Sequence, residues 1–234
     1  MRLDKFLSNM GKATRSESSR LARAGKILVN GVVIKKCDVH IDPTTDIVSL
    51  NGVNVTYRKF TYIMLNKPEG YVSATDDDRE LTVLDLLPDE ERRLGLFPCG
   101  RLDKNTLGLV ILTNDGDSAH RLLSPKHHVS KVYAFKCKLP LSSDDVTSLE
   151  KGVDIGGYLT KPCAIKMEDA TSGFITLTEG KYHQIKRMLE AVDNKITYLE
   201  RVSFGGIVLD PSLARGEWRY LTDNELNILL KEGK

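Results

Sequence analysis

The segment from Gly100 to Leu109 constrains the fold of this 234-residue chain most strongly. It places one carboxylate, Asp103, in a glycine-bounded loop directly before the apolar run 109–112. A short apolar run of this kind predicts a buried strand, so we expect Asp103 at the edge of that strand rather than free in solvent. An Asp before Lys-Asn is also a common turn former, whose side chain accepts backbone hydrogen bonds. The other segments of the chain indicate whether Asp103 is a functional carboxylate or a turn former.

The composition is that of a globular protein, with 41% hydrophobic residues for a core. The cysteines are far apart and form no C-x-x-C pair, so neither a zinc ribbon nor a disulfide scaffold is indicated. We expect reduced thiols and a cytoplasmic protein. The N-terminus lacks a signal-peptide core, and no run approaches the roughly 20 apolar residues of a membrane span. The four cysteines are Cys37, Cys99, Cys137 and Cys163.

Positive charge is concentrated at the N-terminus, although the net charge of the whole chain is only +2. Residues 1–58 contain ten Lys and Arg against five Asp and Glu, a local net charge of +5. A concentration of this kind is typical of a module that binds a polyanion such as nucleic acid. A solvated helix face would explain a moderate excess equally well.

The N-terminal residues predict two short helices followed by a hairpin. Apolar residues at positions 3, 6, 7 and 10 form one helical stripe that stops at Gly11. Thr14 or Ser16 can cap a second helix that ends near Gly25. Residues 26–34 read as two strands joined at Asn-Gly, a strong hairpin signal. A polar junction follows, and we place a domain boundary between residues 58 and 59.

The rest of the chain alternates short strands with capped helices, which predicts an α+β fold around a largely antiparallel sheet. The residues Thr222 to Glu225 match a capping box that opens the last helix. Neither a dinucleotide-binding nor a P-loop glycine pattern occurs. Strands are expected at 60–65, 71–74, 109–113, 131–138 and 174–178, and helices at about 82–87, 117–124, 143–151, 183–192 and 223–231.

Four segments of this chain, taken in order, resemble the pseudouridine synthases and, more narrowly, the RsuA family, which isomerises uridine in ribosomal RNA. They are Asn66–Gly70, Gly100–Leu109, Lys131–Tyr133 and Glu179–Leu189. The resemblance covers nearly the whole chain. It implies a catalytic domain over residues 59–234, built on a mainly antiparallel mixed sheet flanked by helices.

The helix pair and basic hairpin of residues 1–58 resemble the S4 RNA-binding domain. Basic side chains of such a domain contact phosphates and position the protein without reading sequence. An alternative is that some of them only shield the edge of the hairpin. The predicted phosphate contacts are Arg2, Lys5, Arg15, Arg20, Arg23, Lys26, Lys35 and Lys36.

The family resemblance assigns catalytic roles to Asp103, Tyr133 and Lys186. Asp103 matches the aspartate that acts at C1′ of the sugar, and Lys186 matches the basic residue that pairs with it. Tyr133 matches an aromatic residue that packs on the target base. Without the resemblance, a helix-surface lysine and a core-facing strand tyrosine would be the simpler interpretations.

Further positions are predicted to bind substrate or to support the site. Arg101 matches a position that fills the space left by the flipped nucleotide, and Lys126 and Lys131 are predicted to contact the RNA. Lys67 is also predicted at the substrate site, in a loop expected to support its wall. His183, at the start of a predicted helix, is either a capping or packing residue or a functional one, and it is not assigned a catalytic role. The adjacent His127 and His128 lack partners for a metal site, and neither a metal nor a cofactor is expected.

The predicted function is isomerisation of a specific uridine in 16S ribosomal RNA by a monomeric enzyme, without a membrane, within an assembling small subunit. Three alternatives remain open at this point. A large-subunit synthase would use the same chemistry, and an S4-type RNA-binding factor would need only the basic N-terminus. A hydrolytic glycosidase would need a second carboxylate, and the candidates Asp115 and Asp117 lie in a turn that looks structural.

Overall fold

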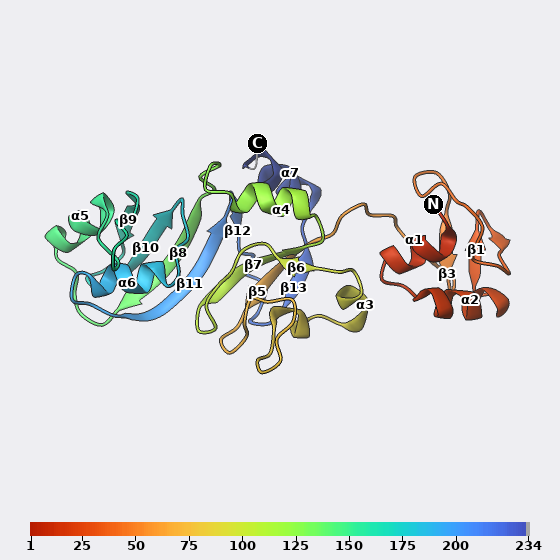
Figure 1. Ribbon diagram of the computed structural model, residues 1–234, viewed down its shortest axis with the longest axis horizontal. Helices are drawn as coiled ribbons and strands as arrows, with labels where there is room; N and C mark the ends of the chain where they lie inside the picture. Colours follow the sequence, from red (N-terminus) through yellow and green to blue (C-terminus); the bar gives the residue numbers. More distant parts are fainter. Residues whose placement is uncertain (233–234) are drawn as a thin grey trace. The chain divides into compact units, whose positions relative to one another are not determined.

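The computed structural model describes residues 1–232 and divides into two compact units (Figure 1). The N-terminal unit comprises Met1–Thr61 and Leu87–Leu96. The larger unit comprises Tyr62–Leu86 and the chain from Phe97 onward. Each unit has its own hydrophobic core.

The N-terminal unit packs two helices on a small antiparallel sheet. Leu3, Phe6 and Leu7 of the first helix are buried in its core, as the apolar stripe predicted. Thr14 caps the second helix in a capping box with Glu17, so the choice between Thr14 and Ser16 falls on Thr14. The elements are α1 (Leu3–Asn9), α2 (Arg15–Arg23), β1 (Ile27–Val29), β2 (Val32–Val33), β3 (Val48–Leu50), β4 (Val53–Asn54) and α3 (Asp89–Arg92), with strand order β2-β1-β3-β4.

The predicted hairpin at Asn30-Gly31 is confirmed. Both residues have positive φ, 50° and 80°, the combination that a tight two-residue hairpin turn requires. Asn51-Gly52 repeats the same geometry between β3 and β4, with φ of 51° and 82°. The same dipeptide therefore folds both hairpins of the unit.

The larger unit contains a mixed sheet, nine-stranded over the residues described. Its main path runs β13-β5-β7-β11-β8-β10-β9, and β6 and β12 add to β7 and β11. The β7–β11 pair is parallel and the other pairs are antiparallel, which confirms the predicted fold class. The strands are β5 (Tyr62–Lys67), β6 (Phe97–Pro98), β7 (Leu107–Thr113), β8 (Lys131–Cys137), β9 (Ala164–Met167), β10 (Ser172–Leu177), β11 (Ile196–Phe204), β12 (Ile207–Val208) and β13 (Trp218–Tyr220).

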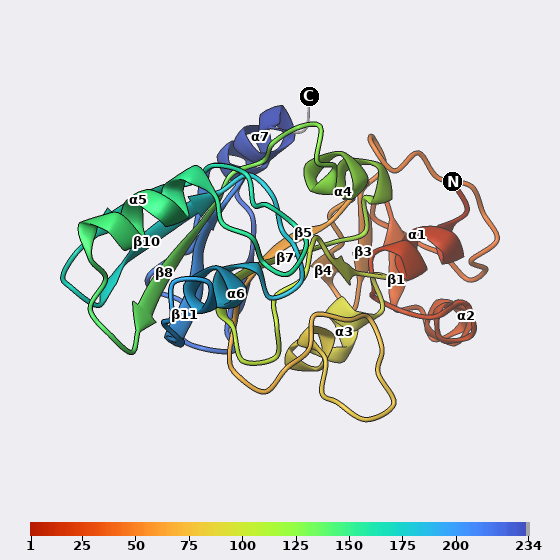
Figure 2. The same ribbon diagram turned by 60° about the vertical axis from the view of Figure 1, so that its left-hand side comes forward.

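Helices cover this sheet in two groups, which Figures 1 and 2 show from different sides. The helices are η1 (Val83–Leu86), α4 (Gly116–Leu123), α5 (Ser143–Lys151), α6 (Gln184–Glu190) and α7 (Asp223–Glu232). Leu122 of α4 and Leu229 of α7 pack with Leu109 and Ile111 of β7 in one core. In the other group, α6 packs on β11 and α5 on β9.

The predicted element pattern is wrong in several places. Residues 71–74 are not a strand, because only Val72 forms an isolated bridge, with Thr82. The prediction also missed α3 and the short strands β3, β4, β6, β9, β12 and β13, as well as the long strand β11, which lies between β7 and β8 in the sheet. Its alternation is interrupted by register shifts, and it carries the buried Arg201, a residue type that normally marks an exposed position.

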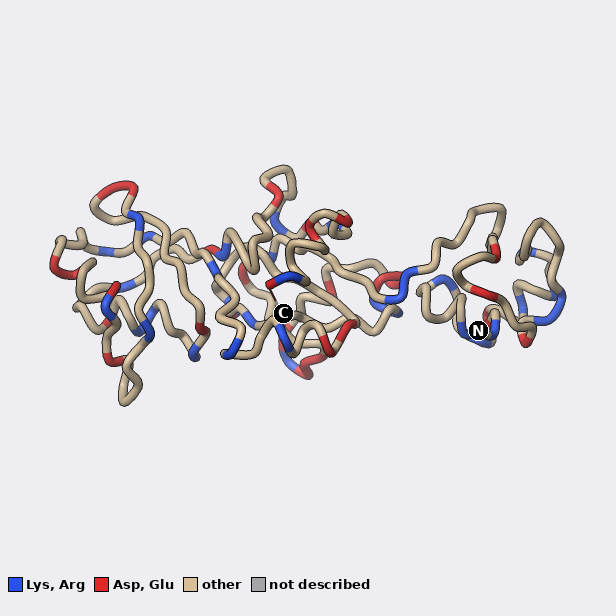
Figure 3. The backbone as a smooth tube through the Cα atoms, turned by 90° about the horizontal axis from the view of Figure 1, so that it is seen from above, with Lys and Arg blue, Asp and Glu red and all other residues tan. Residues whose placement is uncertain are grey.

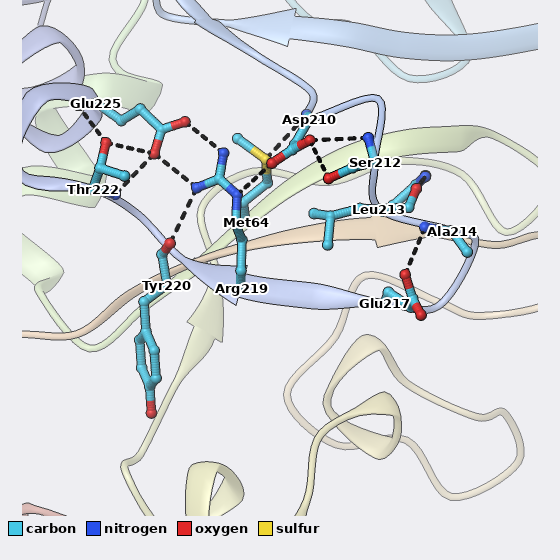
Figure 4. Close-up of polar contacts among 11 residues, drawn as sticks. Met64, Asp210, Ser212, Leu213, Ala214, Glu217, Arg219, Tyr220, Thr222 and Glu225 are labelled. Carbon is cyan, nitrogen blue, oxygen red and sulfur yellow. Dashed lines mark hydrogen bonds and ion pairs between the residues drawn. The ribbon is translucent and has the colours of Figure 1, made fainter.

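Arg219 ties the C-terminal segment of the larger unit together (Figure 4). Its guanidinium donates to Asp210 at 2.8 Å, to the two carboxylate oxygens of Glu225 at 2.8 and 2.7 Å, and to the carbonyl of Tyr220 at 3.1 Å. Glu225 also accepts from the backbone of Thr222, which confirms the predicted capping box. This cluster fixes the start of α7 against β13.

Among residues 1–232, no helix is both long and apolar enough to span a bilayer.

Candidate active site

A cavity of about 690 Å³ opens in the larger unit beside the loop that precedes β7. Its wall is formed by that loop, the start of β8, the end of β10, residues 179–183 before α6, and the middle of β11. Asp103, Tyr133 and Lys186 all line it, together with Arg101 and Lys131. Segments that are far apart in the sequence therefore meet at one site.

Lys67 holds the loop that carries Asp103 in place. The Lys67 side chain is fully buried, and its Nζ donates to the carbonyl oxygens of Pro68, Lys104 and Thr106, each at 2.9 Å. Burial lowers the pKa of Lys67 to about 8. The structure thus contradicts the predicted contact of Lys67 with substrate, because its three donors are used within the protein. Its loop does support the site, as expected.

Two further contacts hold the same loop. The Ser73 hydroxyl accepts from the Leu102 amide at 3.1 Å and lies 3.2 Å from the Leu102 carbonyl oxygen. Gly108 lies opposite Arg201 with φ of 96°, and a Cβ there would be 2.3 Å from the Arg201 carbonyl oxygen. Glycine at position 108 therefore permits the close approach of β7 and β11 directly after the loop.

Asp103 forms an ion pair with Lys186 across the cavity wall. The Asp103 Oδ2 and Lys186 Nζ atoms are 2.7 Å apart, and both side chains are 28% exposed. The second carboxylate oxygen, Oδ1, lies 3.6 Å from His183 Nε2. Asp103 is thus held beside cationic and polar partners while part of its surface faces the cavity.

The first turn of α6 brings Lys186 to Asp103. Ile185, Met188 and Leu189 are buried under the helix, which leaves Lys186 on the side of the cavity. His183 precedes the helix in the left-handed region, with φ of 52°, and its side chain makes no capping hydrogen bond. The capping interpretation of His183 is wrong, since its imidazole faces Asp103 instead.

The other predicted substrate residues differ in their positions. Tyr133 is 9% exposed and contributes a ring to the wall. Lys131 Nζ donates to the Val129 carbonyl at 2.8 Å and lies over the Phe204 ring, and burial lowers its pKa to about 8. Arg101 is exposed on the wall. Lys126 is exposed but does not line the cavity.

Arg201 and Glu179 are buried residues of the cavity wall that were not among the predicted site residues, although Glu179 opens one of the four segments that resemble the family. Arg201 is 1% exposed and donates from Nε to the Leu109 carbonyl at 2.8 Å, while its Nη2 has no hydrogen-bond partner among residues 1–232. Glu179 is buried and accepts hydrogen bonds from Tyr158, Lys161 and Gln184. An arginine inside a strand is a weak signal in a single sequence, whereas Glu179 could have been selected from the segment that carries the resemblance.

The basic residues predicted to contact phosphate are exposed in the N-terminal unit, and their contact with RNA stays a prediction. Lys and Arg occur along much of this unit (Figure 3). Arg2 has one partner already, because it pairs with Asp4 at 2.8 Å. The exposed basic residues are Arg2, Lys5, Arg15, Arg20, Arg23, Lys26, Lys35 and Lys36.

The site suits chemistry at a sugar carbon that needs one carboxylate. A single ionised carboxylate beside a cation can add to an anomeric carbon or stabilise positive charge developing there. Asp115 is not a second catalytic carboxylate, because it caps α4 through Ser118 at 3.1 Å and accepts from the Tyr62 hydroxyl at 2.7 Å. Within residues 1–232, no group of three His, Cys, Asp or Glu is arranged to hold a metal ion.

Comparison with known proteins connects this geometry to a family. Residues 61–191 match the family model described as RNA pseudouridylate synthase, and residues 1–47 match that of the S4 domain. The chain is 50% identical to the "uncharacterized RNA pseudouridine synthase YtzG" of Bacillus subtilis, over 98% of both chains. It is 39% identical to the ribosomal small subunit pseudouridine synthase A of Escherichia coli K12, over 97% of this chain and 98% of that protein.

A solved structure is also similar over the full length. The crystal structure described as a pseudouridylate synthase has a TM-score of 0.69 and 35% identity, and the match covers 98% of this chain and 99% of that one.

Proposed function

The chain belongs to the RNA pseudouridylate synthase family, and from this premise we propose that it isomerises one uridine of 16S ribosomal RNA to pseudouridine. The choice of 16S RNA is supported by the relatives named ribosomal small subunit pseudouridine synthase A, which align over nearly their whole length. The observation that carries the chemistry is the 2.7 Å ion pair of Asp103 and Lys186 on a cavity that Tyr133 also lines.

In the proposed reaction, Asp103 acts at C1′ of the target nucleotide. The N1–C1′ bond breaks, and the carboxylate either bonds to C1′ or stabilises the positive charge there. The uracil turns within the cavity, C5 bonds to C1′, and C5 loses its proton while N1 gains one. All atoms are retained, so the RNA mass does not change.

Lys186 and Tyr133 serve the same step in different ways. Lys186 holds the Asp103 carboxylate in position through the charge-assisted contact of 2.7 Å. Tyr133 supplies an aromatic face against which the uracil can pack as it turns. The target must first leave its stack, at a cost of a few kcal/mol. Arg101, exposed on the wall, is proposed to fill the space in the RNA stack that the target nucleotide leaves.

We further propose that residues 1–58 form the S4-like targeting domain and residues 59–234 the catalytic domain, and that the RNA is met in an assembling small subunit. The two family matches support this division. We propose a monomer as the active species. A cytoplasmic location is supported by the four free cysteines, which suit a reducing compartment.

Pseudouridine mapping tests the proposal. Small-subunit and large-subunit ribosomal RNA, free and in assembling particles, are incubated with the wild-type protein and with Asp103→Asn, and then labelled with carbodiimide and read by primer extension. We expect one new site in 16S RNA that depends on Asp103. A site in large-subunit RNA would overturn the substrate, and abasic sites would indicate hydrolysis. No site in any sample would favour a binding factor.

The targeting role is tested by salt dependence. Arg20 and Arg23 are exposed on α2, so replacing both with Ala removes two phosphate contacts without disturbing the core. We expect weaker RNA binding and a shallower decrease of affinity with salt. An unchanged salt slope would remove these residues from the RNA contact.

A further inference from the structure

Two stacked aromatic side chains stand at the rim of the cavity, where no role has been assigned to them. The rings of Tyr182 and His183 are 3.8 Å apart between centroids and inclined by 18°. Tyr182 is 76% exposed, the largest exposed fraction among the big hydrophobic side chains described. One face of its ring lies on His183, so its other face is open to a further flat group.

The stack is continuous with the proposed catalytic carboxylate. His183 Nε2 lies 3.6 Å from Asp103 Oδ1, and the Tyr182 ring stacks on a face of the same imidazole. The left-handed backbone at His183, with φ of 52°, is a conformation that side chains other than glycine adopt at a cost. His183 is the N-cap residue of α6, but its side chain makes no capping hydrogen bond and instead lines the cavity.

Hydrogen bonds of buried side chains hold the segment that carries the two rings. Gln184 donates to Glu179 at 2.7 Å and accepts from the Lys181 amide at 2.9 Å. Glu179 in turn accepts from the Tyr158 hydroxyl at 2.7 Å, and Lys181 Nζ lies 4.2 Å from the centre of the Tyr158 ring. Tyr182 is therefore exposed on a loop that these hydrogen bonds hold in place, so its ring is ordered before a ligand binds.

We propose that Tyr182 and His183 form a stacking platform for the nucleobase next to the target uridine. This inference rests on the proposed function. Aromatic side chains bind unstacked RNA bases through their faces, and one such contact contributes about 1–3 kcal/mol. When the target uridine enters the cavity at Asp103, its neighbour on the strand lies at the rim and loses its own stacking partner. The open face of Tyr182 replaces that partner.

Stacking, rather than hydrogen bonding, is the proposed contribution of Tyr182. The Tyr182 ring already stacks on His183 and is 76% exposed, so the structure presents an aromatic face to a ligand. Lys161 and Lys181 on the same rim supply positive charge for the adjoining phosphates. Stacking tolerates any base, so the platform orders the strand and leaves the choice of sequence to other contacts.

The first test measures single-turnover pseudouridine formation against RNA concentration. Tyr182→Ala is expected to raise the half-saturating RNA concentration about tenfold, and Tyr182→Phe to stay close to the wild type. Leu159→Ala is the matched control, because Leu159 is 68% exposed but does not line the cavity. The proposal is overturned if Tyr182→Ala behaves like Leu159→Ala, or if Tyr182→Phe is as impaired as Tyr182→Ala.

The second test reads the stacking directly. The base analogue 2-aminopurine is placed on either side of the mapped uridine, and the RNA is bound by Asp103→Asn with and without Tyr182→Ala. At one position we expect fluorescence about twofold lower when the tyrosine is present, because stacking quenches the analogue. Equal intensities at both positions would refute the platform. Failure of the proposed function looks different, since the wild-type protein would then form no pseudouridine at all.

Discussion

The larger unit contains two clusters of opposite charges that differ in how completely their hydrogen-bonding groups are used. In one, Arg219 bonds to Asp210, to both oxygens of Glu225 and to a backbone carbonyl (Figure 4). In the other, Asp103 has one ion pair with Lys186 and an imidazole at 3.6 Å. A charged group whose donors or acceptors are all paired within the protein stabilises the fold. A carboxylate with an unpaired oxygen can still interact with a substrate.

The surroundings of the two clusters reinforce this difference. Arg219 and Glu225 fix the capping box of α7, so their partners are elements of the fold. Asp103 and Lys186 face a cavity, and the loop beneath them is held by other groups, among them Lys67 and Ser73. We therefore expect the first cluster to determine stability and the second to determine activity.

Replacing Asp103 with Asn gives the sharpest separation between activity and stability. We expect more than about a 1,000-fold loss of pseudouridine formation, because the amide cannot act as a nucleophile or carry negative charge. The free energy of unfolding should change by less than about 1 kcal/mol, since the ion pair is partly exposed. Single-turnover assays and urea unfolding measure the two quantities. Retained turnover would remove Asp103 from the mechanism.

Replacing Lys186 tests the partner of the carboxylate. Lys186→Met should reduce the single-turnover rate by roughly a hundredfold, the size of effect seen when one positioned electrostatic group is removed. Lys186→Arg keeps the positive charge in a planar form and should lose less. Equal losses for the two variants would show that the fit of the lysine, and not its charge, matters at this position.

Replacing Arg219 should have the opposite profile. Arg219→Met leaves the carboxylates of Asp210 and Glu225, which are 24% and 19% exposed, without their common partner. We expect the free energy of unfolding, measured in urea, to decrease by about 2 kcal/mol, while the turnover of the folded protein changes little. Arg92→Met is a control, because its pair with Asp89 is exposed and should contribute little. A catalytic defect without destabilisation would contradict the comparison.

A pH titration of stability gives the smallest expected effect. Hydrogen bonds from Arg219 lower the pKa of Glu225 to about 2, against 4.5 for an ordinary glutamate. A lowered pKa means that Glu225 stabilises the fold fully above pH 4.5 and that this contribution is lost as the pH falls from 4.5 towards 2. Urea unfolding across this range should show a steeper decrease for the wild type than for Glu225→Gln. Parallel curves would contradict the linkage.

Local chemistry made much of the fold predictable. The helices of the N-terminal unit and the first hairpin depend on neighbours in the chain: a capping Thr14, an apolar stripe and an Asn-Gly turn. The apolar run 109–112 also lies where its pattern predicts, in a buried strand directly after the Asp103 loop. Prediction failed at β11, because its bulges interrupt the alternation and its Arg201 is buried by residues distant in sequence.

The candidate site divides in the same way. Asp103, Tyr133 and Lys186 were selected by resemblance, and the structure brings them to one cavity. The same resemblance placed Lys67 at the substrate, although its donors are consumed by backbone carbonyls. The role of His183 also depends on geometry, since a histidine before a helix usually suggests a cap and here faces a carboxylate.

The sequence by itself determined the helix caps, the hairpin turns, the basic N-terminus and the residues that mark the family, because each depends on residue type and short spacing. Only the tertiary structure decided which charged groups can still bond to a substrate. Lys67 and Arg219 donate to partners within the protein, whereas the Asp103 carboxylate has one ion pair and faces the cavity. The physical reason is that burial and hydrogen-bond partners are set by segments far apart in the chain. Whether a charged residue supports the fold or acts on a substrate is therefore decided when those segments meet.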